Sequence, residues 1–248
     1  MTTTESSNRL WPLAPEGRTL NDNEVHVWMI RASAYYSEDP RSTAFLSADE
    51  RQRAANFRFD KDRRLYIAAH AGLRALLAGY LGVVEDEIRF ATGFHGKPLL
   101  TYPGGSGLEF NLSHSHELAL VAVARNKSVG VDVELIKRDF AFQELAGRFF
   151  TAKEVVALLT LPQALQLEAF FKCWSSKEAF LKAKATGLSG KLDEVQISTK
   201  GGFVKIEANV PGWSLLELEY THGYAAALVI QGDALPIRCY RWKPGLAV

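Results

Sequence analysis

The chain has 248 residues, 47% hydrophobic and 23% charged, with a formal net charge of +1, so it can bury one large core or two compact halves and gives no global sign of nucleic-acid or membrane binding. Its two cysteines, Cys173 and Cys239, have neither metal-ligand nor disulfide-framework spacing, which favours a reducing compartment. Residues 1–8 are too polar for a signal peptide and the longest apolar run, Leu118–Ala124, is too short to span a bilayer, so we expect a soluble, cytoplasmic protein.

The first half of the chain predicts a strand, two helices and two further strands. Val25–Ile30 alternates like a strand. The segment Phe45–Glu50 contains a Ser-x-x-Glu capping box, the pattern that begins a helix. A long helix is expected near residues 62–81, and strand patterns follow at Asp86–Thr92 and Ala119–Ala124.

The second half repeats this order, with offsets that drift only from 104 to 107 residues (129 − 25 = 104 and 193 − 86 = 107). The counterparts are Val129–Glu134, Phe149–Glu154, a long helix near 166–185, Asp193–Thr199 and Ala225–Ile230, with a last strand at Ile237–Trp242. The four matched short segments, with a long helix in the same place in each half, predict an α+β fold, a pseudo-twofold pair of related α/β subdomains. We expect an N-terminal tail at 1–19, subdomains at 20–127 and 128–248, and a ligand site at their interface.

Two short segments, Gly130–Glu134 and Trp174–Glu178, offer three carboxylates. Alternate side chains of a strand share a face, so Asp132 and Glu134 point the same way. Neighbouring carboxylates repel unless a cation or proton lies between them, and Glu178 from a helix would add a third oxygen ligand. Such a site suits Mg²⁺. The alternative is that the two strand carboxylates are only the wet face of an edge strand.

The repeat favours a metal site over generic surface charge. At its offset, the three carboxylate positions correspond to Trp28, Ile30 and Leu73 of the first unit. Acidic side chains confined to one copy of a duplicated unit indicate a specific role.

Other polar groups leave alternatives open. On the second long helix, Glu178 and Lys182 are either an ordinary ion pair four residues apart or a metal ligand and a phosphate ligand, with Lys177 nearby. Asn111–His116 is either a phosphate-binding turn or a capped turn before a strand. The turn at Gly93–Pro98 presents Lys97 between two strands.

A basic cluster stands at the start of the first long helix, where cations oppose the helix dipole. Its members are Arg58, Lys61, Arg63 and Arg64. They indicate either an anionic ligand or a solvated loop.

These segments, in this order, resemble the 4′-phosphopantetheinyl transferases of the Sfp type. The matching blocks are Gly96–Pro98, Phe110–Ser115, Gly130–Glu134 and Trp174–Lys182, with weaker similarity at Phe57–Arg63 and Leu73–Arg74. The similarity spans nearly the whole chain. It implies two related α/β halves with coenzyme A between them, in agreement with the duplication.

The resemblance implies transfer of the phosphopantetheine arm of coenzyme A to a serine of an apo acyl or peptidyl carrier protein, with release of adenosine 3′,5′-bisphosphate. Asp132, Glu134 and Glu178 would hold Mg²⁺ (or Mn²⁺), and Glu178, Asp132 and Lys182 would be the catalytic residues. The coenzyme A ligands implied are Lys61, Lys97, Asn111, Ser113, His114, Lys177 and Lys182. His70 stands where some relatives carry arginine.

We expect a monomer, because an internally duplicated chain can form the site alone. The competing hypotheses are a non-catalytic coenzyme A or nucleotide-binding protein of the same fold, and a metal-dependent phosphodiesterase. The sequence contains no His/Asp cluster that would supply the second base or metal needed by the phosphodiesterase.

Overall fold

The computed structural model describes residues 11–15, 17, 19–35, 43–93, 96–186, 196–198, 205–207, 211–219 and 223–244. Most of the predicted N-terminal tail, residues 94–95 of the Lys97 turn and residues 193–195 of the repeat lie outside these ranges. Among the described residues, no helix is long and apolar enough to cross a membrane.

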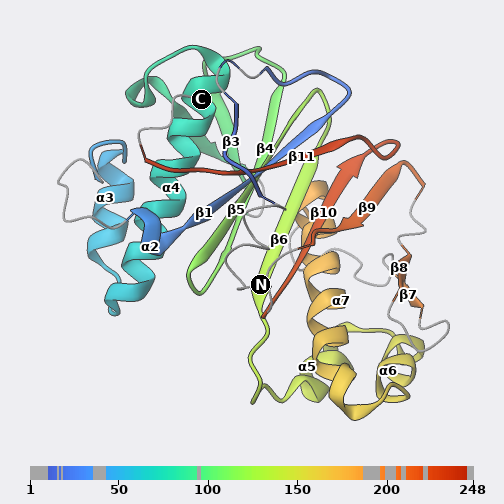
Figure 1. Cartoon of the computed structure of the whole chain (residues 1–248). Helices are drawn as coiled ribbons and strands as arrows, with labels where there is room; N and C mark the ends of the chain where they lie inside the picture. The colour runs from blue at the N-terminus through green and yellow to red at the C-terminus, as the bar shows by residue number, and fades with distance from the viewer. Residues whose placement is uncertain are drawn as a thin grey trace.

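The first unit is built on a four-stranded sheet with the order β11-β1-β5-β4. Its strands are β1 (Val25–Arg31), β4 (Leu108–Ser115), β5 (Leu118–Arg125) and β11 (Ile237–Arg241). β5 is antiparallel to both β1 and β4, whereas β11 is parallel to β1. The long helix α4 (Asp60–Leu81) covers one face of this sheet (Figure 1).

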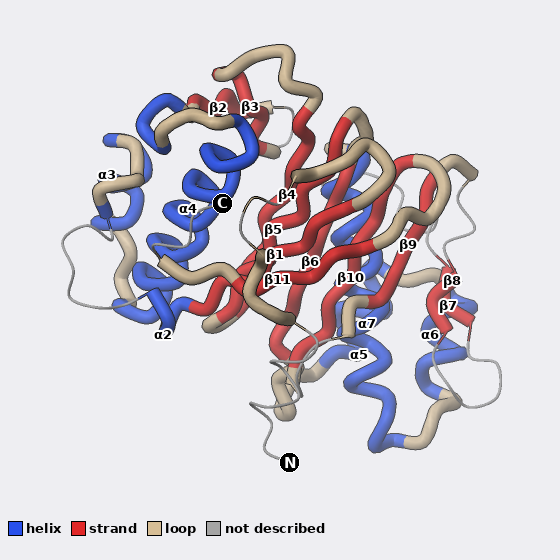
Figure 2. Tube along the Cα trace, turned by 45° about the horizontal axis from the view of Figure 1, so that its top comes forward, coloured by secondary structure: helices blue, strands red, loops and turns tan. Residues whose placement is uncertain are grey.

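Shorter elements gather around α4. They are α2 (Ala32–Tyr35), α3 (Ala48–Ala55), the 3₁₀ helix η2 (Glu85–Glu87), β2 (Arg89–Thr92) and β3 (Pro98–Tyr102). β2 and β3 form an antiparallel hairpin of their own. Figure 2 shows this hairpin at one end of α4, with α3 beside the same helix.

The second unit is built on a three-stranded sheet with the order β6-β10-β9. Its elements are β6 (Val129–Leu135), α5 (Phe142–Phe149), α6 (Ala152–Leu159), α7 (Gln163–Lys184), β7 (Gln196–Ser198), β8 (Lys205–Glu207), β9 (Trp213–Glu217) and β10 (Tyr224–Gln231). The order β1-β5-β4 of the first sheet therefore recurs as β6-β10-β9, and both long helices have 22 residues. The predicted duplication and the α+β class are confirmed.

Local sequence accounts for the helix boundaries. Ser47 and Thr151 are N-caps of α3 and α6, and in each case the glutamate three residues later closes a capping box. Such caps each stabilise a helix by about 1 kcal/mol. α4 ends at Gly82, whose left-handed backbone suits glycine.

The two sheets pack face to face between the two long helices. Val27 and Met29 of β1 meet Val131 and Val133 of β6 in the core between the sheets, where each fully buried side chain contributes roughly 1.5–3 kcal/mol. The neighbouring position Gly130 lies against α7 instead, as the strand alternation predicts for residues 130, 132 and 134. The layers therefore run α4, first sheet, second sheet, α7.

The last strand departs from a simple division into halves. β11 belongs to the second half of the sequence but extends the first sheet beside β1. β11 is thus an exception to the predicted division at residues 127 and 128, and for the other elements that division stays a prediction.

Candidate active site

The two sheets meet along the edge strands β4 and β6, where polar side chains take the place of a backbone ladder. The acceptors Asn111 Oδ1, Ser113 Oγ and Ser115 Oγ receive hydrogen bonds from the N–H groups of Val131, Val133 and Leu135, at 2.8, 3.4 and 3.1 Å. We call this line of contacts the seam. It satisfies backbone donors of β6 that would otherwise be buried without partners.

Asp132 lies at the centre of the seam and is 2% exposed. Its Oδ1 accepts from Ser113 Oγ at 2.8 Å and from Lys182 Nζ at 2.6 Å. Lys182 Nζ also donates to Ser113 Oγ, at 2.8 Å. The second oxygen, Oδ2, is buried and has no hydrogen-bond partner in the described part of the chain. Burial of an unpartnered carboxylate oxygen is costly, so this atom is suited to a cation.

Glu134 and Glu178 lie in the same corner. Ser115 Oγ donates to Glu134 Oε2 at 2.9 Å, which fixes that side chain at the end of the seam. Burial and the charge of Asp132 raise the pKa of Glu134, and the same two causes raise the pKa of Glu178. The charge of Asp132 thus makes both glutamates harder to ionise, and a divalent cation would remove that repulsion.

Among the described residues, no three His, Cys, Asp or Glu side chains lie close enough together to bind a metal ion in the present arrangement. The donor set nevertheless fits a hard divalent ion: three carboxylates, one with an orphaned buried oxygen, two with raised pKa values. Lys182 of α7 pairs with Asp132 of β6. One of the two predicted alternatives was instead an ion pair between Lys182 and Glu178 on the surface of the helix.

The structure places Lys177 away from this corner, which corrects the expectation that it binds coenzyme A. Its ammonium group is fully buried, 2.8 Å from Glu154 Oε1 and 5.3 Å from the ring centre of Phe150. A buried ammonium held in this way does not reach an exposed phosphate.

The basic side chains at the start of α4 do not gather into an anion-binding site in the structure. Arg63 and Arg64 both pair with Asp60 on the helix surface. Lys61 is exposed on the first turn of α4 and is not among the residues that line the cavity described below. The solvated-loop alternative fits these side chains better.

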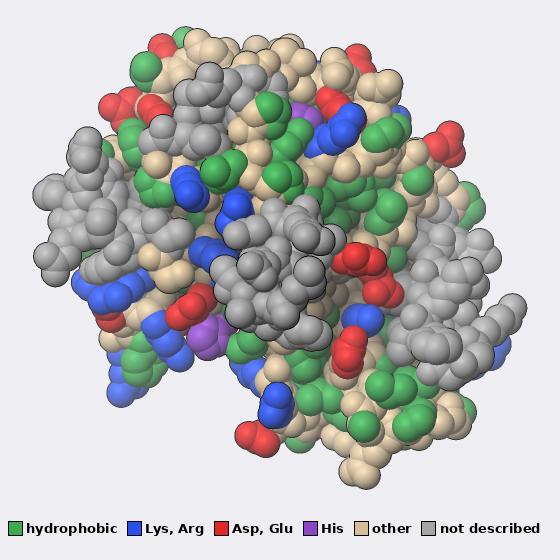
Figure 3. Space-filling model, in the orientation of Figure 1, with side chains coloured by type: hydrophobic (Ala, Val, Ile, Leu, Met, Phe, Trp, Pro, Cys, Tyr) green, Lys and Arg blue, Asp and Glu red, His purple; other side chains and the backbone are tan. Residues whose placement is uncertain are grey.

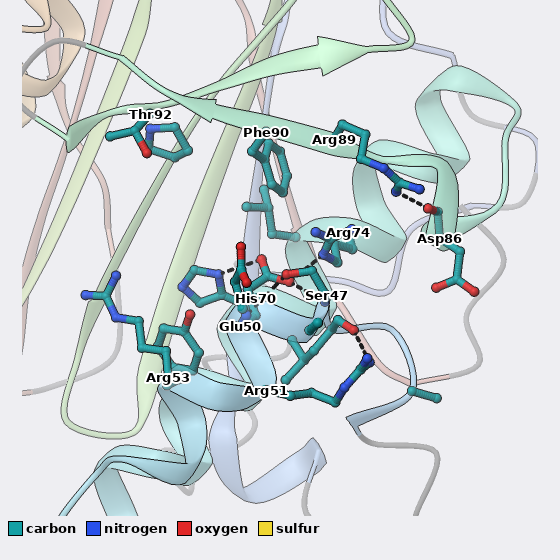
Figure 4. Close-up of a pocket in the computed structure, with 17 residues that line it drawn as sticks. Ser47, Glu50, Arg51, Arg53, His70, Arg74, Asp86, Arg89, Phe90 and Thr92 are labelled. Atoms are coloured by element: carbon teal, nitrogen blue, oxygen red, sulfur yellow. Dashed lines mark hydrogen bonds and ion pairs between the residues drawn. The ribbon is translucent and has the colours of Figure 1, made fainter.

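A cavity of about 740 Å³ lies in the first unit, between α3, α4 and the β2–β3 hairpin. Figure 4 shows Glu50 at its centre, between His70 and Arg74 of α4. Glu50 contacts His70 Nδ1 at 3.3 Å and accepts from Arg74 Nε at 2.7 Å. Burial acts to raise the pKa of Glu50, but hydrogen bonds with His70 and the Ser47 N–H and the charge of Arg74 lower it to about 2. Arg53 also lines the cavity.

His114 connects the two regions because it follows Ser113 on β4 and therefore points to the opposite face. Loss of hydration lowers its pKa, and the charges of His70, Lys182 and Arg53 lower it further. The ring thus lies within electrostatic reach of both the cavity and the carboxylate corner. A ligand lying over the edge of β4 could contact both.

Lys97 and Asn111 lie at the start of the seam. Lys97 Nζ donates to the carbonyl oxygen of Val129 at 3.3 Å, and burial lowers its pKa. Asn111 is 4% exposed and its oxygen is used by the backbone of β6. Asn111 and Ser113, both predicted as ligands, therefore join the two units.

Arg53 and Tyr66 were not among the predicted site residues. A signal was present, because Tyr66, His70 and Arg74 recur every four residues and so form one polar stripe on α4, a helix otherwise rich in apolar residues. Glu50 and Arg53 form the matching pair on α3, three residues apart.

Figure 3 shows acidic, basic and hydrophobic side chains interspersed on one face of the molecule, with an indentation between the lobe of α2–α4 and the lobe of α5–α7. The seam runs between these two lobes, since β4 belongs to the first sheet and β6 to the second.

Residues 128–229 match the family described as 4′-phosphopantetheinyl transferase superfamily, and residues 35–126 match the family described as 4′-phosphopantetheinyl transferase, N-terminal. The 4′-phosphopantetheinyl transferase HetI of a Nostoc species is 38% identical over 94% of this chain and 96% of its own. The 4′-phosphopantetheinyl transferase Sfp of Bacillus subtilis is 30% identical over 68% and 74% of the two chains. The L-aminoadipate-semialdehyde dehydrogenase-phosphopantetheinyl transferase of Xenopus laevis is 32% identical over 61% and 53%.

These similarities confirm the resemblance seen in the ordered sequence blocks, and the two family matches adjoin where the first sheet gives way to β6. Because a relative of 38% identity covers nearly its whole length, the chain belongs to the 4′-phosphopantetheinyl transferase superfamily.

Proposed function

We propose that this chain transfers the 4′-phosphopantetheine moiety of coenzyme A to a serine of an apo acyl or peptidyl carrier protein at the seam between β4 and β6. The observation that carries the proposal is the state of Asp132. One of its oxygens is neutralised by Lys182, while the other is buried with no partner among the residues that the structure describes, beside two carboxylates with raised pKa values.

Asp132, Glu134 and Glu178 would hold Mg²⁺, with Mn²⁺ as a substitute, since oxygen ligands of this kind suit hard divalent ions. When bound, the ion would supply charge neutralisation for the diphosphate and the leaving group. Lys182 contributes a fixed positive charge at the same corner. Transfer at phosphorus depends mainly on such positioning and electrostatic stabilisation.

The nucleotide end of coenzyme A would lie toward the cavity on the other side of β4. A volume of about 740 Å³ is within the range of ligand sites. Arg53 of α3 and His70 of α4 line this cavity, and both lie within electrostatic reach of His114 on β4. Lys97 would add charge near the diphosphate. These side chains can hold phosphate oxygens by charge-assisted hydrogen bonds.

In the reaction, the serine oxygen of the carrier bonds to the phosphorus that bears pantetheine. The bond from that phosphorus to the oxygen of adenosine 3′,5′-bisphosphate breaks, and this product leaves. Glu178 would accept the serine proton, because its raised pKa brings it closer to the working range of a general base.

Two further features belong to the proposal. Both units contribute to the site within one chain, which supports a monomer. Cys173 and Cys239 are unpaired, which supports a cytoplasmic location.

Glu178→Gln tests the role of the carboxylate corner, with Glu168→Gln as control. Glu168 lies on the same helix and makes a surface pair with Lys172 at 3.2 Å. We expect Glu178→Gln to lower turnover by about a hundredfold or more, measured by the mass gain of an apo carrier, and Glu168→Gln to change it little. Near-normal turnover of Glu178→Gln would remove it from the mechanism. Coenzyme A binding without any carrier modification by the wild-type protein would favour the non-catalytic alternative.

A further inference from the structure

The buried pair of Lys177 and Glu154 is not part of the set proposed to hold the metal or coenzyme A, yet it is among the most enclosed polar features of the described residues. Its two side chains are 0% and 2% exposed. Buried ion pairs seldom stabilise a fold more than apolar residues of the same size would, although breaking one is costly. Such a pair can instead select one packing arrangement over others.

Glu154 is fixed from a second direction. Its Oε2 accepts the backbone N–H of Thr151 at 2.8 Å, and Thr151 Oγ1 accepts the N–H of Glu154 at 3.3 Å, so the capping box of α6 holds this carboxylate in place. The other oxygen binds Lys177. The start of α6 is thereby tied to one side of α7.

The position of Lys177 in the helix gives this tie a consequence for the site. Glu178 is the next residue, about 100° further around the helix axis, and Lys182 is four residues beyond Glu178, on nearly the same side. Fixing Lys177 toward α6 therefore fixes the direction in which Glu178 and Lys182 point. Lys182 reaches Asp132 at 2.6 Å in this arrangement.

A second contact sets how closely α7 approaches β6. Gly130 lies two residues before Asp132, and a Cβ atom added there would be 2.1 Å from the carbonyl oxygen of Ala179. The helix thus rests directly on the backbone of the strand. With the distance set by Gly130, rotation about the helix axis is left to be set by the ion pair.

The same device occurs in the first unit, where the equivalent helices α4 and α7 start 103 residues apart (163 − 60 = 103). There the capping-box residue Glu50 of α3 pairs with the buried Arg74 of α4, as Figure 4 shows (154 − 50 = 104 and 177 − 74 = 103). In that unit Glu50 also contacts His70 and lines the cavity. In the second unit, by contrast, the pair of Lys177 and Glu154 is buried from solvent.

We infer that Lys177 and Glu154 are positioning residues, which set the rotation of α7 and so present Glu178 and Lys182 to Asp132. This inference rests on the proposed function for its effect on catalysis, and on geometry alone for its effect on the pairing of Lys182 with Asp132.

The test uses the full chain carrying Lys177→Met and Glu154→Gln together. Met keeps an unbranched side chain in the space, and Gln keeps the capping box, since either Glu or Gln serves at that position. The matched control applies the same exchanges to Lys172 and Glu168, a pair on α7 that is far more exposed, at 33% and 54%; Lys172 also contacts Glu217 of β9 at 3.5 Å. We expect the buried double variant to melt cooperatively and to lose about tenfold to a hundredfold in kcat, with KM for coenzyme A changed less than about threefold. The control should keep wild-type kcat.

A second readout does not depend on activity. Lys182→Met is introduced into the wild type and into the buried double variant, and the urea midpoints are compared as a double-mutant cycle. We expect Lys182→Met to lower the midpoint of the wild type and to lower that of the double variant by less than half as much, because the pairing with Asp132 is already displaced. Equal shifts, or a kcat of the folded double variant within about twofold of wild type, would overturn the inference.

The two readouts separate the inference from the proposed function. If the wild type fails to modify any carrier, the proposed function fails and the stability cycle alone decides the positioning role. If the double variant does not fold, Lys177→Arg, which keeps the charge but alters the geometry of the pair, is taken through the same two measurements.

Discussion

Gly130→Ala tests the closest contact between β6 and α7 with the addition of one methyl group. The new Cβ would lie 2.1 Å from the carbonyl oxygen of Ala179 and 2.4 Å from the backbone nitrogen of Ala183. Both atoms belong to helix backbone, so they cannot turn aside as a flexible side chain would. The contact must lengthen from 2.1 to at least 3.4 Å, so α7 has to move away from the strand by about 1.3 Å.

That displacement carries Glu178 and Lys182 away from Asp132. Overpacking of this kind costs about 1–3 kcal/mol of stability. A misplacement of about 1 Å at a catalytic site can cost about a hundredfold in rate. We therefore expect Gly130→Ala to fold with a lower Tm and to lose about a hundredfold in kcat, measured by the mass gain of an apo carrier at saturating coenzyme A.

Gly147→Ala is the matched control. Gly147 lies in α5 and a Cβ there would meet nothing within 4 Å, so the same exchange should raise stability by up to about 1 kcal/mol and leave kcat unchanged. A Gly130→Ala protein with kcat within about twofold of wild type would refute the claim that the spacing of β6 and α7 positions the site.

Three further predictions address the seam, the cavity and the metal. Ser113→Ala removes the hydroxyl that serves Asp132, Lys182 and a backbone N–H, so urea unfolding should show a loss of about 2–4 kcal/mol; a loss below about 0.5 kcal/mol would show that the seam contributes little. The pKa of Glu50 is lowered from 4.5 to about 2, so its stabilising contribution is present above the unfolded-state pKa and is lost as pH falls from about 4.5 to about 2, a change of about 3 kcal/mol. Glu50→Gln should flatten the stability curve over that window, and a curve that keeps the slope of the wild type would contradict the assigned network. Removal of divalent ions with a chelator should abolish transfer and added Mg²⁺ should restore it, whereas full activity in the chelator would exclude the proposed ion.

The parts of the fold that could be predicted are those written in local periodicity. Alternation placed Asp132 and Glu134 on one face of β6, and Ser-x-x-Glu and Thr-x-x-Glu marked the starts of α3 and α6. The repeat of these patterns then predicted two related sheets, since the same pattern of hydrophobic and capping residues favours the same topology.

The seam could not be predicted, because it depends on which strand edges meet. Asn111 and Ser113 carry the same hydrogen-bonding groups whether they face a phosphate or a backbone N–H. Only the tertiary arrangement places them against β6, where their oxygens are already used. The same reason applies to β11. Its sequence predicts a strand but does not indicate that the strand pairs with β1.

Lys177 shows a different limit. The helix α7 is buried on several sides, so the hydrophobic pattern gives weak guidance on which direction each side chain takes. Adjacent residues Lys177 and Glu178 therefore looked equally suited to the site, although one points to α6 and the other to the carboxylate corner. The pairing with Glu154 decides between them, and that residue is 23 positions away in the sequence.

The most direct test of the central claim follows both products of one reaction. The protein is incubated with coenzyme A, Mg²⁺ and an apo carrier, and the holo carrier and adenosine 3′,5′-bisphosphate are quantified together. The account predicts that the carrier gains the mass of one phosphopantetheine and that the bisphosphate appears in equal amount. Release of the bisphosphate without any gain in carrier mass, or no reaction with any of several carriers, would contradict it.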